Sequence, residues 1–376
     1  MAGRENPLFT YGDTVTFQIA TSDVIALLSP TEVPFVQRIG LDGDPGKFRV
    51  ENWPSTQVKW FEDEVRALTV GLGAAITTTT GTSVTLATGA GWNVMVNDVV
   101  KVDDEYMYVT ARNADTLTVT RGFWGSTAAT HASSASVTRV TQAALEGATF
   151  ETSGTSVPTA QYNYTQIFRD VIRISNSELV QSRYGIEDVL AYQTSVKTAD
   201  IMRLVEKAAF TGIRSAGSES TPRTMGGLTY FITTNTASMS NNYITETAIL
   251  NMVRTIYESS GQTPSLLVCG PLTAQTIDTL WEGKVVVQPS SDAVGMLTRR
   301  IVTRYGDLEV LSSHLCPPDK AFILNLDHVG FLTYRPLEVT QLAQTGDVKA
   351  WQIALEVTMV VRNDKCHGII TGIKTT

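Results

Sequence analysis

The first candidate for chemistry is a glycine-rich stretch, GLDGDPGKF, that runs from Gly40 to Phe48. A phosphate-binding loop has four residues between its first glycine and a Gly-Lys pair, and a Ser or Thr follows the lysine to hold magnesium. Here five residues intervene, and Phe48 stands where the hydroxyl side chain should be. We therefore interpret the stretch as a connector rich in turn residues.

Nucleophilic and zinc chemistry have little support in the sequence. It contains no G-x-S-x-G elbow and no H-E-x-x-H helix, and its histidines lie in unrelated contexts, at His131, His314, His328 and His367. Cys366 and His367 are adjacent, but we expect them on a strand, where neighbouring side chains point to opposite faces. We predict no catalytic residues, no metal site and no cofactor.

Two further clusters have a functional and a structural interpretation. Asp103-Asp104-Glu105 could attract calcium, but it lacks the alternate spacing of oxygen ligands and the mid-loop glycine of an EF-hand, so a solvated hairpin turn is favoured. Phe123-Trp124, within RGFWGST, could form a platform for a glycan or the core of a small β domain. The core is favoured, because small domains need large apolar anchors.

Composition limits the class of protein. The chain has 376 residues, of which 43% are hydrophobic and 18% charged, as in folded proteins of more than one domain. Its net charge of -8 argues against a surface that neutralises phosphates. The three cysteines, Cys269, Cys316 and Cys366, have no C-x-x-C spacing, which indicates a reducing compartment without disulfides. We find neither a leader peptide nor an apolar run of about 20 residues that could span a membrane.

The pattern along the chain changes several times. Residues 1–34 are polar and β-branched, typical of an arm that orders on another surface. The run VKWFEDEVRAL fits a strand or a short helix. From 69 to 141, Thr, Ser, Gly and Val dominate, which predicts a small all-β module of short strands.

A long helix and a mixed α and β region follow. The best helix extends over 186–211, between Gly185 and Gly212, with a stripe formed by Ile186, Leu190, Ile201, Leu204 and Ala208. Residues 222–376 alternate helical and strand-like windows, so the fold class is α+β. Alternating apolar residues near the end, in IALEVTMVVRNDKCHGIITGI, predict one long closing strand.

Four stretches together resemble tailed-phage major capsid proteins with the Hong Kong 97 type of fold. They are IFRDVIRISNS, YGIEDVLAYQTSVKTADIMRLVEKAAFTG, RTMGGLTYFI and VTMVVRNDKCHGIITGI, and their order also fits. The β module would then be an insertion in the extended loop, as in a subgroup of these proteins. One departure is that no long scaffolding segment precedes the arm.

The resemblance implies a division of the chain into parts, which we expect at the following places. They are an N-terminal arm (1–34), an extended loop with the start of the peripheral domain (35–68 and 142–180), an inserted β domain (69–141), the spine helix of the peripheral domain (181–222), an axial domain (223–350) and a return strand to the peripheral domain (351–376). Gly212, Gly226 and Gly227 are expected to form a hinge after the spine helix, where a sharp redirection needs φ angles that glycine adopts easily.

The function that the resemblance implies is that of a non-enzymatic head protein. Identical copies would assemble into pentamers and hexamers of an icosahedral shell around double-stranded DNA, without sequence-specific binding and without a membrane. Portal protein, and scaffolding or decoration proteins, would be further partners, and assembly would occur in the cytoplasm of the host bacterium. We expect the arm and the extended loop to carry contacts between subunits, and the β module to lie on the outer surface.

Two alternatives remain open at this point. An encapsulin-like compartment shares the fold but encloses protein cargo. A β-rich adhesin or decoration protein would explain the β module. A hydrolase is a remote third, since the motifs for it are missing.

Overall fold

The computed structural model describes residues 32–41, 55–143, 146, 158–180, 188–281, 300–344 and 346–375. Two compact units are present. The first combines 1–60 with 161–376, and the second comprises 61–160, so the second unit lies in the chain between the two parts of the first. Most of the arm predicted at 1–34, and residues 42–48 of the glycine-rich stretch, lie outside the described residues.

The long helix of the first unit is α3 (Val189–Thr211). It begins at Asp188, whose carboxylate accepts hydrogen bonds from two backbone N–H groups of the first turn, and it ends at Gly212. At about 1.5 Å per residue, its 23 residues span roughly 35 Å. Within the described part of the predicted range, 186–211, the helix is confirmed.

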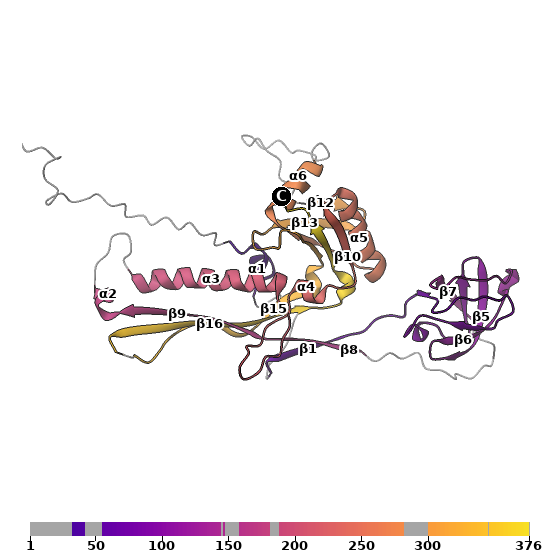
Figure 1. Cartoon of the computed structure of the whole chain (residues 1–376), viewed down its shortest axis with the longest axis horizontal. Coiled ribbons are helices and arrows are strands. Elements are labelled where there is room, and N and C mark those ends of the chain that lie inside the picture. Colours follow the sequence, from indigo (N-terminus) through magenta and orange to yellow (C-terminus); the bar gives the residue numbers. More distant parts are fainter. Residues whose placement is uncertain are drawn as a thin grey trace, which may run out of the picture. The chain divides into compact units, whose positions relative to one another are not determined.

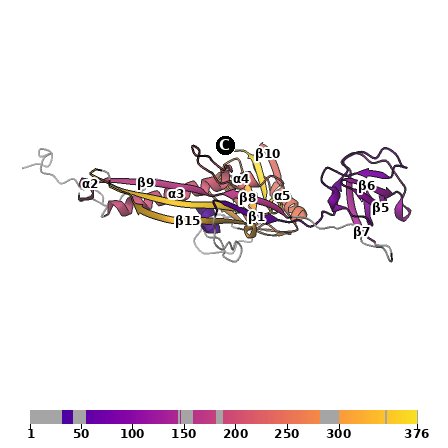
Figure 2. The ribbon, with the colours of Figure 1, turned by 90° about the horizontal axis from the view of Figure 1, so that it is seen from below.

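A three-stranded antiparallel sheet lies beside this helix. Its strands, in spatial order, are β15 (Val329–Gln341), β16 (Val348–Val361) and β9 (Gln166–Ser175). Both views show β9 and β15 running along α3 (Figures 1 and 2). Alternate residues of β9, among them Phe168 and Ile172, are buried in the same core as Ile201 and Val205 of the helix.

The buried stripe of α3 differs from the prediction. Ile201, Val205 and Ala209 are buried at intervals of four residues, whereas Leu204 is 52% exposed. Leu204 precedes Val205 by one residue, a rotation of about 100° around the helix, so it points away from the core. Its inclusion in the predicted stripe is therefore wrong.

A six-stranded mixed sheet forms the rest of the first unit. Its strands, in spatial order, are β10 (Thr236–Asn242), β17 (Gly368–Ile373), β14 (Ala321–Leu324), β11 (Leu266–Cys269), β13 (Gly306–Ser312) and β12 (Arg300–Thr303). Helices α5 (Glu246–Ser260) and α6 (Pro271–Trp281) pack on it. In β11, Leu266 belongs to the core shared with α3 and Leu267 to the core shared with α5, so this strand is buried on both faces.

The end of the chain forms two strands instead of the single one predicted from its alternating pattern. β16 ends at Val361, and the short 3-10 helix η4 (Asp364–Cys366) separates it from β17. Asn363 adopts a left-handed conformation, with φ 53°, at this turn. The polar run from Arg362 to Lys365 interrupts the apolar alternation here, and it was a turn signal that the single-strand prediction overlooked.

Short elements complete the first unit. They are α1 (Pro34–Ile39), α2 (Asn176–Val180), α4 (Leu228–Phe231) and the 3-10 helix η3 (Leu326–His328). β1 (Gln57–Glu62) pairs with β8 (Thr159–Tyr164) in a two-stranded sheet. The run VKWFEDEVRAL, for which helix and strand were both open, is thus a strand as far as Glu62.

The second unit is an antiparallel six-stranded sheet. Its strands, in spatial order, are β2 (Thr69–Gly71), β7 (Ser136–Gln142), β4 (Asp98–Val102), β5 (Glu105–Asn113), β6 (Thr116–Thr120) and β3 (Ser83–Thr85). The 3-10 helices η1 (Gly91–Asn93) and η2 (Phe123–Gly125) lie in its loops. The chain after β2 hydrogen-bonds to the end of β3, from Gly73 N to Thr85 O and from Ala87 N to Gly71 O, so the two edges of the sheet meet. Closure removes open edges and allows so small a sheet to hold its own core.

Candidate functional site: a glycine crossing, an arm anchor and the surfaces around them

The three glycines predicted as a hinge lie at a crossing of two backbone segments. After α3 the chain leaves Gly212, makes an excursion and returns to Gly227, whose N–H donates to the carbonyl of Gly212 at 2.9 Å. A Cβ built on Gly227 would lie 2.5 Å from the carbonyl oxygen of Ala209, and one on Gly212 would lie 2.5 Å from that of Ala208. Any other residue would therefore force the segments apart.

The predicted reason for these glycines is wrong. Gly212 has φ -58° and Gly227 has φ -100°, values that every residue adopts, and Gly226 is not among the residues with positive φ. At Gly212 and Gly227 the close approach of backbone to backbone requires the absence of a side chain. At Gly226 the space is limited by the side chains of Phe231 and Tyr230. Whether the crossing also moves as a hinge stays a prediction.

Asn163, at the end of β8, fixes the third glycine. Its side chain is fully buried, accepts a hydrogen bond from Gly226 N at 2.8 Å and donates to Gly226 O at 3.0 Å. It also donates to the carbonyl of Met359 in β16, at 2.7 Å. One amide thus joins the β1–β8 ladder, the glycine crossing and the three-stranded sheet. Sequence reasoning missed Asn163, although an asparagine inside the alternating run TAQYNYTQIF was a signal.

Close to this amide, the side chain of Glu356 in β16 forms a second group of hydrogen bonds between distant parts of the chain. Its buried carboxylate accepts hydrogen bonds from Thr165 Oγ1 at 2.6 Å, from Arg335 Nε at 2.8 Å and from the guanidinium of Arg223. Burial alone would raise the pKa of Glu356, but these donors outweigh burial and the pKa lies below its ordinary value. The carboxylate therefore favours its charged form, and it ties the junction between β8 and β9, β15 and the loop before Gly226 to one point.

The beginning of the described chain is anchored by Glu206 of α3. Its Oε2 accepts from the backbone N–H groups of Phe35 and Val36, both at 3.1 Å, and its Oε1 accepts from Ser313 Oγ at 2.5 Å. Burial raises the pKa of Glu206 above its ordinary value although these groups donate to it. The carboxylate caps the first turn of α1, where orphan N–H groups need a partner.

Packing and a surface ion pair reinforce this anchor. The ring of Phe35 lies 4.8 Å from that of Phe210 and 6.2 Å from that of Phe331, between centroids. Arg38 of α1 pairs with Glu309 of β13 at 2.8 Å. The anchor joins residues about 170 apart in sequence, so no local pattern could have revealed it. It fixes the first helix of the described chain to α3 and β13.

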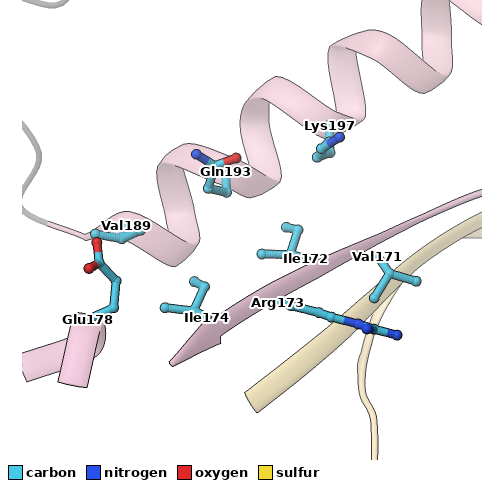
Figure 3. Close-up of a pocket in the computed structure, with 8 residues that line it drawn as sticks. All are labelled: Val171, Ile172, Arg173, Ile174, Glu178, Val189, Gln193 and Lys197. Carbon is cyan, nitrogen blue, oxygen red and sulfur yellow. The ribbon is translucent and has the colours of Figure 1, made fainter. Parts of the chain in front are cut away.

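Figure 3 shows a cavity of about 370 Å³ between β9 and the first half of α3. Its walls are aliphatic at Ile172, Ile174 and Val189, and Lys197 lies at its rim, where it pairs with Asp170 at 2.7 Å. The remaining lining residues are Val171, Arg173, Glu178 and Gln193. Aliphatic walls with charged edges suit contact with another polypeptide.

The acidic cluster of the second unit differs from its predicted form. Asp103 and Asp104 form the turn between β4 and β5, but Glu105 is buried, not solvated. Its carboxylate takes a bidentate pair from Arg121, at 2.6 and 2.7 Å, and lies 2.9 Å from His131 Nε2. Burial alone would raise the pKa of Glu105, but these donors lower it to about 2.

The sequence favoured a place in the core for the aromatic pair Phe123-Trp124 of the second unit, and this prediction is wrong. Trp124 is 58% exposed and Phe123 is half-buried. The core instead consists of aliphatic side chains and Met107. Small aliphatic residues on six closed strands fill this interior, so no aromatic anchor is needed.

Cys366 and His367 are both buried. Cys366 ends η4 and His367 follows it outside any strand, so the predicted placement on a strand is wrong. His367 Nδ1 lies 3.3 Å from Asn325 N and Nε2 lies 3.2 Å from Arg362 O. Burial lowers the pKa of His367 to about 4 and raises that of Cys269 to about 12.

Within the part of the chain that the structure describes, no cluster of three or more His, Cys, Asp or Glu side chains is placed to hold a metal ion. Nor does any helix among those residues combine the length and apolar character needed to cross a membrane.

Large apolar side chains are exposed at several separate places. The most exposed are Val65 at 95%, Val180 at 87%, Val302, Phe61, Ile213 and Leu68. In the chain, Phe61 lies in β1, Val65 and Leu68 lie between β1 and β2, and the other three lie in α2, in β12 and in the loop after α3. Single exposed aliphatic residues are common, but this distribution provides several distinct apolar contacts and not one patch.

Comparison with known proteins gave two kinds of match. A family model described as "SU10 major capsid protein" matches residues 9–374. Among solved structures, the capsid of Myoviridae phage XM1 is similar with a TM-score of 0.52 and 10% identity, over 94% of this chain and 96% of that one. The capsid of an empty GTA particle is similar with a TM-score of 0.51 and 12% identity, over 94% and 95%. No curated protein matches the sequence.

Proposed function

The chain belongs to the SU10 major capsid protein family, and from this premise we propose that its copies form pentamers and hexamers of the icosahedral head of a tailed phage. The α+β capsid fold of the Hong Kong 97 type, expected from the resemblance, is confirmed by the two structural matches. The family is structural, so the protein is a major capsid protein and not an enzyme. The family match over 9–374 is the observation that carries the proposal.

The geometry supports assembly through several unlike contacts. Rings of five and six that close into a shell need heterologous interfaces, so each subunit must offer different surfaces to different neighbours. The exposed apolar side chains Val65, Val180 and Ile213 lie in three different segments, namely the loop between β1 and β2, helix α2 and the loop after α3. The cavity beside α3 is a further site of contact. These surfaces bury their apolar area when copies meet.

The parts of the chain take the roles that the resemblance implies. Residues 1–34 act as an arm, and its root is held by Glu206 and the Phe35 ring. The segments 35–68 and 142–180 form the extended loop, 69–141 the inserted domain, 181–222 the spine, 223–350 the axial domain and 351–376 the return strand. The inserted domain lies on the outer surface of the shell.

The enclosed cargo is double-stranded DNA, held without sequence-specific contacts. A net charge of -8 supports enclosure without direct neutralisation of phosphates. The portal protein, and scaffolding or decoration proteins, join the shell, and assembly takes place in the host cytoplasm. The alternatives of an encapsulin-like compartment and of an adhesin are not favoured, because the family match is to a major capsid protein.

Expression of the full chain alone, followed by negative-stain electron microscopy, tests this function. Closed shells built of rings of five and six are expected. A second preparation that lacks residues 1–34 should give few or irregular shells. Normal shells without these residues would remove the arm from the proposal, and the absence of any shell from the full chain would overturn the proposal itself.

A further inference from the structure

Four aromatic rings lie together on the outer side of the second unit. Tyr106 and Tyr108 alternate along β5 with the buried Glu105, Met107 and Val109, so both face away from the core. Phe123 stacks on Tyr108, with 5.3 Å between ring centroids. Trp124 lies 5.5 Å from both Tyr106 and Phe123. We call these four residues the aromatic platform.

Trp124 has a backbone conformation that is unfavourable for a bulky residue. Its φ and ψ are 56° and 26°, in the left-handed region, where a bulky side chain is strained. The same side chain is 58% exposed, so burial in its own unit does not compensate for the strain. Strained and exposed residues of this kind concentrate at binding sites, where the geometry serves a partner.

The turn that contains Trp124 is held by hydrogen bonds to the buried residues beneath it and within the turn. Gly122 and Gly125 flank it, with φ 63° and 78°, and Gly122 N donates to the buried carboxylate of Glu105 at 3.1 Å. Ser126 Oγ donates to Phe123 O at 2.9 Å. The platform is therefore organised before any partner arrives, which lowers the entropy cost of binding.

We propose that the aromatic platform binds a carbohydrate, a chain of pyranose rings with equatorial hydroxyl groups. Such a sugar presents flat faces of C–H bonds, whose partial positive charge is attracted by the negative faces of aromatic rings. Polar groups flank the platform for the hydroxyl groups of the sugar. Lys101 lies 5.6 Å from the centroid of the Tyr106 ring and pairs with the fully exposed Asp104.

The extent of the platform favours a sugar over a second copy of the chain. A stable contact between proteins buries on the order of 1,000 Å² or more around an apolar centre. The platform consists of four rings, three of them half-buried, with a charged pair at its edge. A patch made of so few partly exposed rings suits a small ligand better than a protein interface.

The experiment uses the full-length protein, as shells or as unassembled subunits, so its result does not depend on the proposed function. Cellohexaose and chitohexaose are titrated while tryptophan fluorescence is recorded. The sequence has six tryptophans, so Trp124→Phe serves to assign the signal. We expect a saturable fluorescence shift with at least one sugar. Isothermal titration calorimetry, which does not need the tryptophan as reporter, should show binding about tenfold or more weaker for Trp124→Ala. Trp92→Ala, which removes another exposed tryptophan of the same unit, should bind like the wild type.

A second variant separates binding from folding. Trp124→Gly relieves the strain, because glycine adopts positive φ readily. If Trp124 serves a ligand, this variant loses sugar binding while its thermal unfolding temperature is unchanged or higher. A lower unfolding temperature, or loss of shell assembly, would show that the ring serves the fold or a neighbouring copy and would overturn the proposal. The proposal would also be overturned if neither sugar bound the wild type. The same holds if decaproline, a proline-rich peptide that also packs on aromatic rings, bound as tightly as the sugars.

Discussion

The N–H of Gly227 and the carbonyl of Gly212 meet at 2.9 Å, where the chain that returns from its excursion crosses the end of α3. Around this contact, a Cβ on either glycine would lie within 2.6 Å of two backbone carbonyl oxygens. Asn163, Arg223 and Glu356 connect the same region to two sheets. The crossing is therefore the point where helix α3 and the β1–β8 ladder are fixed to one another.

Gly227→Ala tests the close approach at the crossing. Because a methyl group cannot fit beside the carbonyls of Ala208 and Ala209, we expect a loss of about 2 kcal/mol or more in the free energy of unfolding. Urea denaturation measures the loss. Gly71→Ala is the matched control, since nothing lies within 4 Å of its Cβ position and its φ is not positive, and it should be nearly neutral.

Asn163→Ala tests the buried amide. The substitution leaves the N–H of Gly226 and the carbonyls of Gly226 and Met359 without this buried partner. We expect the free energy of unfolding to fall by about 2–4 kcal/mol. Asn242→Ala, in which only an exposed bond to Met239 O is lost, should cost less than about 1 kcal/mol. Equal effects of the two substitutions in chemical denaturation would contradict the role given to Asn163.

Glu206 offers a comparison of two substitutions at the arm anchor. Glu206→Gln can still accept from Phe35 N and Val36 N, and it removes a buried charge, so we expect little loss of stability. Glu206→Ala leaves the first turn of α1 uncapped, so hydrogen exchange at Phe35 and Val36 should become faster by about tenfold or more. Unchanged exchange in the alanine variant would mean that ring packing alone holds the anchor.

Acid should weaken the second unit through Glu105. Its pKa is lowered to about 2 in the folded protein, below the ordinary 4.5, so its contribution to stability is complete above about pH 4.5 and is lost as the pH falls towards 2. The shift corresponds to roughly 3 kcal/mol.

Thermal unfolding followed from pH 5 to pH 2 measures this loss. Glu105→Gln has no carboxyl group at this position, so its stability should lack this part of the pH dependence. It should also be less stable at neutral pH, because the buried guanidinium of Arg121 loses its charged partner. A wild-type profile identical in slope to that of the glutamine variant would contradict the assignment.

Local patterns in the sequence predicted the elements whose signals are local. The helix that ends at Gly212 and the short strands between Thr69 and Gln142 follow from periodicity, β-branched composition and turn residues. The change of sheet at η4 was missed, because the polar run from Arg362 to Lys365 between β16 and β17 was not given weight as a turn signal.

Long-range contacts explain the remaining errors. Glu206 and Glu356 receive hydrogen bonds from residues far away in the sequence, so their burial could not be inferred from neighbours. The three glycines were predicted to form a hinge because of their φ angles, whereas close packing is what the structure shows around them. The hinge itself stays a prediction. Trp124 was assigned to a core that its own unit fills with aliphatic residues.

Sedimentation velocity of the purified full-length chain over a range of concentrations tests the central claim most directly. One chain has a mass of 40.8 kDa. If copies close into a shell through the surfaces described above, the boundary should divide into free subunits and a uniform megadalton species, whose share grows with concentration. A single species of one chain mass at every concentration and under every condition that keeps the protein folded would contradict the account.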